Sequence, residues 1–357
     1  MRHTLNAEIA GMRENPLKTA VLGLDETGRL LLEATKGLDC FSISAVADSD
    51  TNLAQQVARE WNCAAYDDYR QLVIANQLDC LFAVAPVHSC GEHLRMALKK
   101  KFNILKLPPF ARTFSEAAEF AKLAQDEKVT LVLASPGRFA KPALAMKNYV
   151  LQNPAEQPFF ILAAAGPKKG PDPFFAKWRN DPVIAGGGVI LYDCWDIIDQ
   201  ITWNFGIPQQ VYCVAGSTAT DRQQRLYLTE DSAIVTMKFS DTLSCTLLAG
   251  RAAGAVGQAQ KWLTAQSKNI LMKADDKRFE VTDTQGRCIQ RDDFDDNYLG
   301  RMKMVLENFG SNLLAPDKNP LVSTTADNLR NMAVIEAAYL SARTGMPEEP
   351  GRILKIA

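Results

Sequence analysis

The segment best suited to chemistry is a turn with two glycines and an aspartate, Gly23-x-Asp25-x-x-Gly28. It follows a short apolar run and opens a stretch with helical character, a context in which glycines let dinucleotide phosphates approach a helix start. Asp48 ends the next apolar run, 20 residues after Gly28, where a carboxylate can bind the ribose hydroxyls. The residues predicted to bind a cofactor here are Gly23, Asp25, Glu26, Thr27, Gly28 and Asp48.

The same turn predicts weak binding of NAD. Ser49 follows Asp48 with no arginine beside it for a 2′-phosphate, which favours NAD over NADP. Asp25 replaces the middle glycine of the dinucleotide pattern, and Glu26 adds a second carboxylate. One charge about 5 Å from the pyrophosphate, at an effective dielectric constant of about 20, contributes roughly 3 kcal/mol of repulsion, or about two orders of magnitude in affinity. The alternative is an ordinary strand–helix turn that binds no cofactor.

A second group of residues has the chemistry of metal ligands. His88, Cys90 and His93 lie close together in the sequence, and imidazole and thiolate groups suit zinc. Their spacing matches no established metal-binding motif. We therefore expect no metal, and a zinc site at these three residues is the alternative.

Basic residues in two segments could bind an anionic substrate. One segment is the loop Gly166–Gly170 with Trp178 and Arg179, and the other holds Arg138 and Lys141. A solvated surface is the alternative interpretation of both segments.

Five apolar runs are predicted to be the strands that position the cofactor turn: Lys18–Leu22, Ser42–Ala47, Cys80–Ala85, Asn103–Leu107 and Thr130–Ala134. Helix-like stretches separate them, and one begins near Thr113, where Thr113-x-x-Glu116 has the spacing of a capping box. Continuous apolar runs are typical of strands covered on both faces, and their alternation with helices indicates βαβ units. The pattern predicts an α/β fold with a Rossmann-like, doubly wound parallel sheet.

From about Lys141 the pattern changes to strands with few helices between them. Alternation in Ile234–Phe239 indicates a largely antiparallel sheet with one buried face. The open face of such a sheet is often covered by a second copy, so we expect a C-terminal α+β domain that forms a homodimer or homotetramer through its sheet. The predicted strands are Phe159–Ala164, Gln210–Ala215, Ala233–Phe239, Leu243–Leu248, Asn269–Ala274 and Arg278–Thr282, with a final helix at Ala326–Arg343.

Composition excludes several classes of protein. The 357 residues carry 40 Lys+Arg and 41 Asp+Glu, so charge indicates neither a nucleic-acid partner nor an anionic membrane surface. No apolar stretch approaches the roughly 18 residues of a membrane span. The eight cysteines form no CxxC pair and the first residues resemble no secretory signal, which predicts a reduced, cytoplasmic protein. The length favours two domains, at residues 17–142 and 143–357, after an N-terminal extension at 1–16.

Eight segments carry a further signal: AVLGLDETG (20–28), SAVADSD (44–50), YDDYRQL (66–72), LDCLFAVAP (78–86), ILKLPPFA (104–111), GRFAKP (137–142), AGGGVILYDCWDIID (185–199) and VIEAAYLSARTG (334–345). Taken in order, they resemble the glucose–fructose oxidoreductase / inositol dehydrogenase (Gfo/Idh/MocA) family. The resemblance implies a Rossmann domain, a C-terminal α/β domain whose open sheet forms the oligomer interface, and NAD(P)-dependent oxidation of sugars or polyols. It also implies that Pro86 and Cys90, after the strand Cys80–Ala85, contact the cofactor.

The resemblance implies positions for the catalytic residues, and other residue types occupy them. The family's Glu-Lys-Pro falls on Leu107-Pro108-Pro109, so Pro108 stands at the lysine position. The family's aspartate and its general-base histidine fall on Tyr192 and Asp196, and Cys90 stands where a histidine is common. Proline cannot relay a proton, and a carboxylate is a poor base at neutral pH. The sequence therefore predicts lost or greatly reduced dehydrogenase activity, with a retained cleft for a small, sugar-like ligand.

Substitute groups keep an active enzyme open as the alternative. Lys106 has the strand parity of position 108, Asp193 adjoins the lost carboxylate, and Tyr192 could act as an acid. With these groups the chain would be an NAD-dependent dehydrogenase of a sugar, polyol or related compound. A third possibility is a metal-assisted or cofactor-free enzyme that uses the histidine–cysteine segment.

Overall fold

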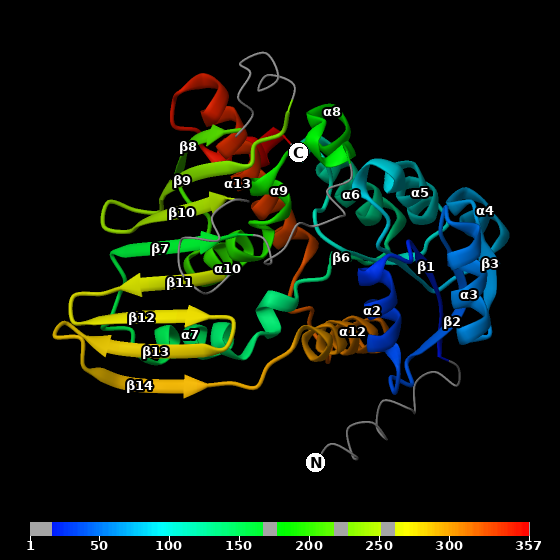
Figure 1. The fold of residues 1–357 in the computed structure, drawn as a ribbon, viewed down its shortest axis with the longest axis horizontal. Helices are drawn as coiled ribbons and strands as arrows, with labels where there is room; N and C mark the ends of the chain where they lie inside the picture. Colours follow the sequence, from blue (N-terminus) through cyan, green and yellow to red (C-terminus); the bar gives the residue numbers. More distant parts are fainter. Residues whose placement is uncertain (1–15, 167–176, 218–227, 251–260, 357) are drawn as a thin grey trace. The chain divides into compact units, whose positions relative to one another are not determined.

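The computed structural model of the chain describes residues 16–166, 177–217, 228–250 and 261–356. It contains two compact units (Figure 1). Unit 1 comprises Met1–Phe110, Ala118–Pro136 and Asn297–Thr325, and unit 2 comprises Ala111–Ala117, Gly137–Asp296 and Ala326–Ala357. In the described part of the chain, no helix is long and apolar enough to cross a membrane.

Six parallel strands form the sheet of unit 1, in the spatial order β3-β2-β1-β4-β5-β6. The strand order reverses between β1 and β4, and ligands bind at the carboxyl ends of strands at such a switch point. The predicted doubly wound parallel sheet is confirmed. Strand β3 is absent from the predicted set because it has only three residues, and these are too exposed to form an apolar run. The strands are β1 (Leu17–Leu22), β2 (Phe41–Ala47), β3 (Ala64–Tyr66), β4 (Cys80–Ala83), β5 (Asn103–Lys106) and β6 (Leu131–Leu133).

Helices connect these strands, and side chains determine where they begin. In α2, α3 and α4 an aspartate (Asp25, Asp50 and Asp68) accepts a hydrogen bond from a backbone N–H of the first turn. At α6 the Thr113 hydroxyl accepts from the Glu116 N–H, which confirms the predicted start of that helix. The helices are α2 (Glu26–Thr35), α3 (Thr51–Trp61), α4 (Tyr69–Ala75), α5 (Val87–Lys99) and α6 (Phe114–Glu127).

Helix α12 (Tyr298–Leu314) also belongs to unit 1, whereas the sequence-based division places it in the second domain. Its buried residues Met302, Val305, Leu306 and Phe309 follow the spacing of one helix face. Phe309 lies 6.4 Å from Phe82, measured between ring centroids, and α12 packs on α2. This burial attaches a segment that is distant in sequence to the parallel sheet.

Eight strands form the sheet of unit 2, in the order β14-β13-β12-β11-β7-β10-β9-β8. Only the β7–β10 pair is parallel within the described sheet, so the largely antiparallel prediction is confirmed. The predicted set lacks β11 and β14; β14 is a mostly exposed, polar edge strand, and therefore has no apolar run. The strands are β7 (Phe160–Ala165), β8 (Gln210–Gly216), β9 (Ser232–Lys238), β10 (Ser244–Gly250), β11 (Lys261–Gln266), β12 (Ile270–Asp275), β13 (Arg278–Asp283) and β14 (Cys288–Asp293).

One face of this sheet is covered by helices. Helix α7 packs on β12 and β13, α9 packs on β9 and β10, and α10 packs on β7 and β11. Side chains such as Val235, Leu247 and Leu263 are buried beneath them. The helical elements of unit 2 are η1 (Pro136–Phe139, which begins in unit 1), α7 (Lys141–Gln152), η2 (Lys177–Asn180), α8 (Pro182–Ala185), α9 (Val189–Tyr192), α10 (Trp195–Phe205), α13 (Thr325–Thr344), α14 (Pro350–Ile353) and η3 (Leu354–Ile356).

Candidate functional site

The glycine turn of unit 1, Gly23–Gly28, lies at the carboxyl end of β1, and neighbouring backbone packs closely against both glycines. Gly23 has a φ of +91°, and a Cβ atom there would lie 2.5 Å from the backbone nitrogen of Ala85, which follows β4. A Cβ atom on Gly28 would overlap the carbonyl oxygen of Gly23. Both positions therefore require glycine, because the start of α2 lies directly against the end of the sheet.

Asp25 already binds the helix start that a pyrophosphate would approach. Its Oδ1 accepts a hydrogen bond of 2.9 Å from the Gly28 N–H, so it caps α2. Glu26 follows it in the exposed first turn, and Thr27 is half-buried beside them. A helix N-terminus attracts negative charge, and the Asp25 carboxylate of this chain already uses one of its N–H groups. A pyrophosphate at this turn would lie beside the Asp25 carboxylate, while the two glycines of the pattern are in place.

Asp48 lies beside this turn, as the spacing predicts, and its carboxylate is held by the backbone. One oxygen accepts from the Leu24 N–H at 2.7 Å, and the other accepts from the Asp50 N–H at 2.9 Å. Each oxygen keeps a second lone pair that a hydroxyl can use. Asp48 thus joins the end of β2 to the glycine turn and retains capacity to accept further hydrogen bonds.

Tyr69 is a neighbour of this turn that the sequence does not identify. Burial and then the charge of Asp48 raise the pKa of the Tyr69 phenol to about 12. Its ring packs edge-on against His93, with the ring centroids 5.7 Å apart. The Asp-Tyr pair at 68–69 signals only a helix start, so nothing in the local sequence shows that Tyr69 faces Asp48.

The segment after β4 holds the predicted contacts Pro86 and Cys90. Pro86 precedes the first turn of α5, and Cys90 is buried, with its thiol 3.9 Å from the Val87 carbonyl oxygen. His93 is half-buried, and burial lowers its pKa. No group of three or more His, Cys, Asp or Glu side chains that could hold a metal ion occurs among the described residues, which include His88, Cys90 and His93.

Lys106 is buried in unit 1, with 2% of its surface exposed. Its Nζ donates to the Leu107 carbonyl oxygen at 2.9 Å and to the Pro109 carbonyl oxygen at 2.6 Å. The backbone that carries Pro108 therefore occupies two of the three hydrogen-bond donors of this amine.

In unit 2, Tyr192 and Asp193 follow the three glycines and lie at the end of α9. The Tyr192 hydroxyl donates to the Ala185 carbonyl oxygen at 2.8 Å, and its ring contacts Trp178 and Arg179. Asp193 is the C-cap residue of α9, and it is half-buried. The chain after Gly166 lies outside the described residues up to 176, so the predicted basic loop is not placed.

Asp196 lies in the first turn of α10 and is paired with a lysine from the sheet. Its Oδ2 lies 2.8 Å from the Nζ of Lys261, the first residue of β11. Burial alone would lower the pKa of Lys261, but the charge of Asp196 and its hydrogen bond raise it overall. Lys261 has no signal in the sequence, because β11 itself is absent from the predicted strands.

The three glycines before α9 have a packing role. Gly186 has a φ of +81°, and Cβ atoms on Gly187 and Gly188 would overlap Tyr339 and Glu230. The Glu230 carboxylate accepts hydrogen bonds from the Gly188 and Ile190 N–H groups and from the Tyr339 hydroxyl. Burial raises the pKa of Glu230. Glu230 and Tyr339, both half-buried, hold the turn that carries Tyr192, and the run of glycines is the sequence signal of its close packing.

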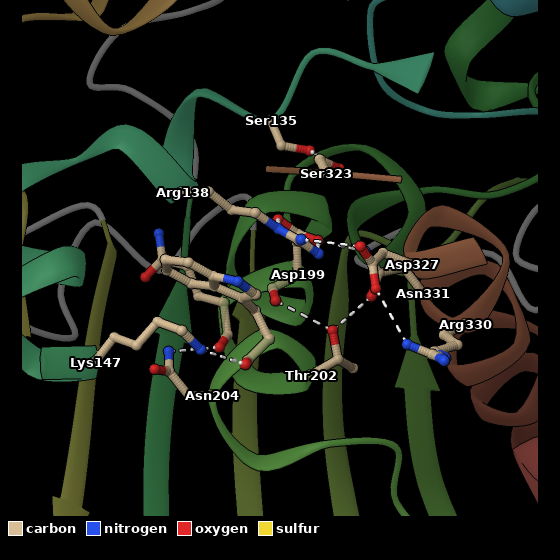
Figure 2. A network of polar contacts seen from close by, with 12 residues as sticks. Ser135, Arg138, Lys147, Asp199, Thr202, Asn204, Ser323, Asp327, Arg330 and Asn331 are labelled. Carbon is tan, nitrogen blue, oxygen red and sulfur yellow. Dashed lines mark hydrogen bonds and ion pairs between the residues drawn. The ribbon is translucent and has the colours of Figure 1, made fainter. Parts of the chain in front are cut away.

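Arg138 lies in a buried polar network (Figure 2). It donates to both carboxylate oxygens of Asp199, at 2.9 and 2.7 Å, and to Asp327 at 3.1 Å. Asn331 from α13 donates to Asp199 at 2.7 Å. Lys141 instead is exposed, and its amine donates to the Asp295 carbonyl oxygen. Arg138 thus joins η1, α10 and α13 within unit 2, and its guanidinium is used by the protein rather than offered to a ligand.

Comparisons with known proteins place both units in one family. A family model described as the oxidoreductase family, NAD-binding Rossmann fold, matches residues 17–135, and the model of the C-terminal alpha/beta domain of that family matches residues 163–349. An uncharacterised oxidoreductase of Schizosaccharomyces pombe is 25% identical over 219 residues, which cover 58% of this chain and 56% of that protein. The match thus spans about half the length of this relative.

Solved structures share the fold. An oxidoreductase from Agrobacterium radiobacter, in complex with NAD+, L-tartaric acid and magnesium, has a TM-score of 0.80 at 19% identity and covers 94% of this chain and 99% of its own. A levoglucosan dehydrogenase in complex with NADH and levoglucosan has a TM-score of 0.80 at 16% identity, with the same coverage of both chains. At these identities the likeness is one of fold alone.

Proposed function

The chain belongs to the Gfo/Idh/MocA oxidoreductase family, and from this premise we propose that it binds a small, sugar-like molecule and has lost most or all of its dehydrogenase activity. Family membership supports the Rossmann fold of unit 1 and the α/β fold of unit 2. The proposal concerns the positions at which the family's catalytic lysine, aspartate and histidine stand, which hold Pro108, Tyr192 and Asp196 here.

The observation that carries the proposal is that the groups able to replace the lost ones are already bonded. The Lys106 amine donates to two backbone carbonyls and is buried. The Tyr192 hydroxyl donates its proton to the Ala185 carbonyl oxygen. Asp196 is neutralised by Lys261 at 2.8 Å. A group that moves a proton during catalysis must reach the substrate directly or through one water, and each of these contacts would have to break first.

The alternative is an active NAD-dependent dehydrogenase that uses substitute groups such as Lys106, Tyr192 and Asp193. One observation favours it: Lys261 supplies an amine beside Asp196, at the position of the family's histidine, and this pair is partly exposed. An amine next to a carboxylate is the type of pair that can transfer protons.

An activity assay separates the two possibilities. We expect purified protein with NAD and a panel of sugars, polyols and hydroxy acids to form no NADH beyond an enzyme-free control. Pro108→Lys should not restore activity either, because Tyr192 and Asp196 are unchanged. NADH formation by the unmodified protein would contradict the proposal, and loss of that activity in Lys261→Met but not in Lys106→Met would then identify the substitute amine.

We also propose that unit 1 binds NAD and that the carboxylates of Asp25 and Glu26 lower its affinity for NAD. The NAD complexes of structural neighbours support NAD as the ligand type of the fold. The Asp25 carboxylate at the start of α2 supports the lowered affinity for NAD.

The free state of all eight cysteines supports a reducing compartment such as the cytoplasm.

A second copy of the chain is the proposed partner of the open sheet face. Across β8, β9 and β10, Val214 pairs with Ile234, and Ile234 pairs with Leu248. The row continues through Ala164 of β7 to Trp262 of β11. Val214 is 57% exposed and Ile234 is 51% exposed. The strongly exposed end of this apolar row, at Val214 and Ile234, favours a homodimer or homotetramer, because monomers rarely expose large apolar patches.

The substitution Ile234→Lys should abolish this assembly, because a charge at the centre of an apolar interface is left without a partner. Light scattering after size-exclusion chromatography measures the result: the unmodified protein is expected to elute as a dimer or tetramer, and the variant as a monomer. The matched control is Ile74→Lys in α4 of unit 1, where the isoleucine is 56% exposed. A monomeric unmodified protein, or a variant that keeps its assembly, would refute the interface.

A further inference from the structure

Arg179 lies against two aromatic rings in unit 2, which also contact each other. It lies in η2, with its guanidinium carbon 5.6 Å from the ring centroid of Trp178 and 5.0 Å from that of Tyr192. The two rings meet edge-on at 5.9 Å. A cation–π contact of this kind attracts the charge, but an aromatic ring offers the N–H groups no oxygen acceptor of the kind that a carboxylate provides.

The described chain provides no acceptor for this guanidinium. The Nε of Arg179 is buried without a hydrogen-bond partner, and no described carboxylate lies within ion-pair distance of the residue. Other arginines with similar or deeper burial are paired: Arg95 with Glu119, Arg112 with Glu116 and Arg138 with Asp199. A half-buried cation without a counter-ion is costly, since its lost hydration is not replaced.

Two carboxylates near Arg179 have other roles: Asp181 lies two residues along the chain, and Glu230 follows Thr229, which bonds to the Arg179 backbone. Asp181 caps α8 through the Val183 and Ile184 N–H groups. Glu230 accepts from the Gly188 and Ile190 N–H groups and from the Tyr339 hydroxyl. Neither carboxylate is therefore available to neutralise Arg179 without breaking several hydrogen bonds.

The position of Arg179 is fixed by its surroundings. The Thr229 hydroxyl donates to the Arg179 carbonyl oxygen at 2.8 Å, and the Thr229 N–H donates to the Asn180 carbonyl oxygen at 3.0 Å. The Tyr192 ring, which contacts the guanidinium, is itself held by the hydrogen bond from its hydroxyl to the Ala185 carbonyl oxygen. A guanidinium that is held before binding loses little entropy when it meets an anion, which strengthens binding.

We propose that Arg179 binds a carboxylate of the ligand, and that the ligand is accordingly an acidic, hydroxylated small molecule such as a hydroxy acid or a sugar acid. The planar fork of the guanidinium matches the two oxygens of a carboxylate. This inference rests on the proposed function, since it names the class of the small molecule that the protein retains. It also gives a role to Tyr192, whose ring supports the guanidinium where the family has a shorter carboxylate side chain.

Two pairs of small molecules, each an acid and its neutral counterpart, test whether the protein prefers a ligand with a carboxylate. L-tartrate and L-threitol differ only in whether the terminal carbons are carboxylates, and D-glucuronate and D-glucose differ only at carbon 6. Titration calorimetry without NAD should show that one acid or both bind about 10- to 100-fold more tightly than their neutral partners, the range expected for a charge-assisted hydrogen-bond pair. Arg179→Gln should remove this preference, and Arg179→Lys should keep only part of it.

Controls separate binding from folding. Arg95→Gln removes an arginine of unit 1 and should leave the preference unchanged. Tyr192→Phe keeps the ring and should retain most of the preference, whereas Tyr192→Leu should reduce it, with melting temperatures recorded for every variant. Equal affinity for acid and neutral probe, no binding of either acid, or an unchanged preference in Arg179→Gln would overturn the inference. These outcomes are independent of NADH formation, which tests the proposed loss of dehydrogenase activity.

Discussion

Asp25→Gly should tighten the binding of NAD by about two orders of magnitude. The change removes the carboxylate that occupies the Gly28 N–H and restores a glycine at the position where the dinucleotide pattern requires close approach. One charge about 5 Å from the pyrophosphate is worth roughly 3 kcal/mol at an effective dielectric constant of about 20. Glycine is nearly as good a helix cap as aspartate, so the loss of stability should be only a few tenths of a kcal/mol, by the usual order of magnitude.

Fluorescence enhancement of NADH measures this change as a ratio of dissociation constants. The matched control is Asp68→Gly, which removes the capping aspartate of α4 in the same unit but not the charge at the turn. Because part of the effect is electrostatic, high salt should narrow the difference between Asp25→Gly and the unmodified protein. Equal affinity in both proteins would show that Asp25 turns away from the phosphates or that NAD binds elsewhere.

Asp199→Ala should destabilise unit 2 by about 3–5 kcal/mol, because it removes the fully buried one of the two carboxylates that pair with the buried Arg138. Arg138 and Asp199 are each only 2% exposed, and their side chains share two hydrogen bonds. Asn331 would lose an acceptor in the same step. Asp327 would still contact Arg138, but it is more exposed and also pairs with Arg330 (Figure 2). Native proteins are stable by only about 5–15 kcal/mol, so the loss is a large fraction of the total.

Urea denaturation followed by circular dichroism measures the change in the unfolding midpoint. The double variant Arg138→Met with Asp199→Leu should recover much of the lost stability, because replacing a buried ion pair by apolar residues is often neutral. Glu119→Gln, which breaks the exposed Arg95 pair, should cost less than about 1 kcal/mol. A loss in Asp199→Ala as small as in this control would show that Arg138 gains access to water in the variant.

The fold was predictable because its signal is local. Apolar runs such as Ser42–Ala47 and the alternation around Val235 report burial on two faces or on one, and that pattern distinguishes a parallel from an antiparallel sheet. The strands that the pattern does not reveal, β3, β11 and β14, are short or carry mixed and polar residues. Their place in the sheet depends on pairing with neighbours and not on their own composition.

The candidate site was predictable in part. The sequence alone determined the residue types at the predicted cofactor turn and at the positions where the family resemblance places catalysis, because glycine, proline and charge restrict the chemistry of a position wherever it lies. Only the tertiary structure decided what those groups bind: Asp25 the start of α2, Asp196 a lysine 65 residues away, and Lys106 its own backbone. The partner of Asp196 lies on a segment distant in the chain, which no local pattern records. Asp25 and Lys106 bond within three residues, but only the conformation of the backbone brings those N–H and C=O groups to their side chains.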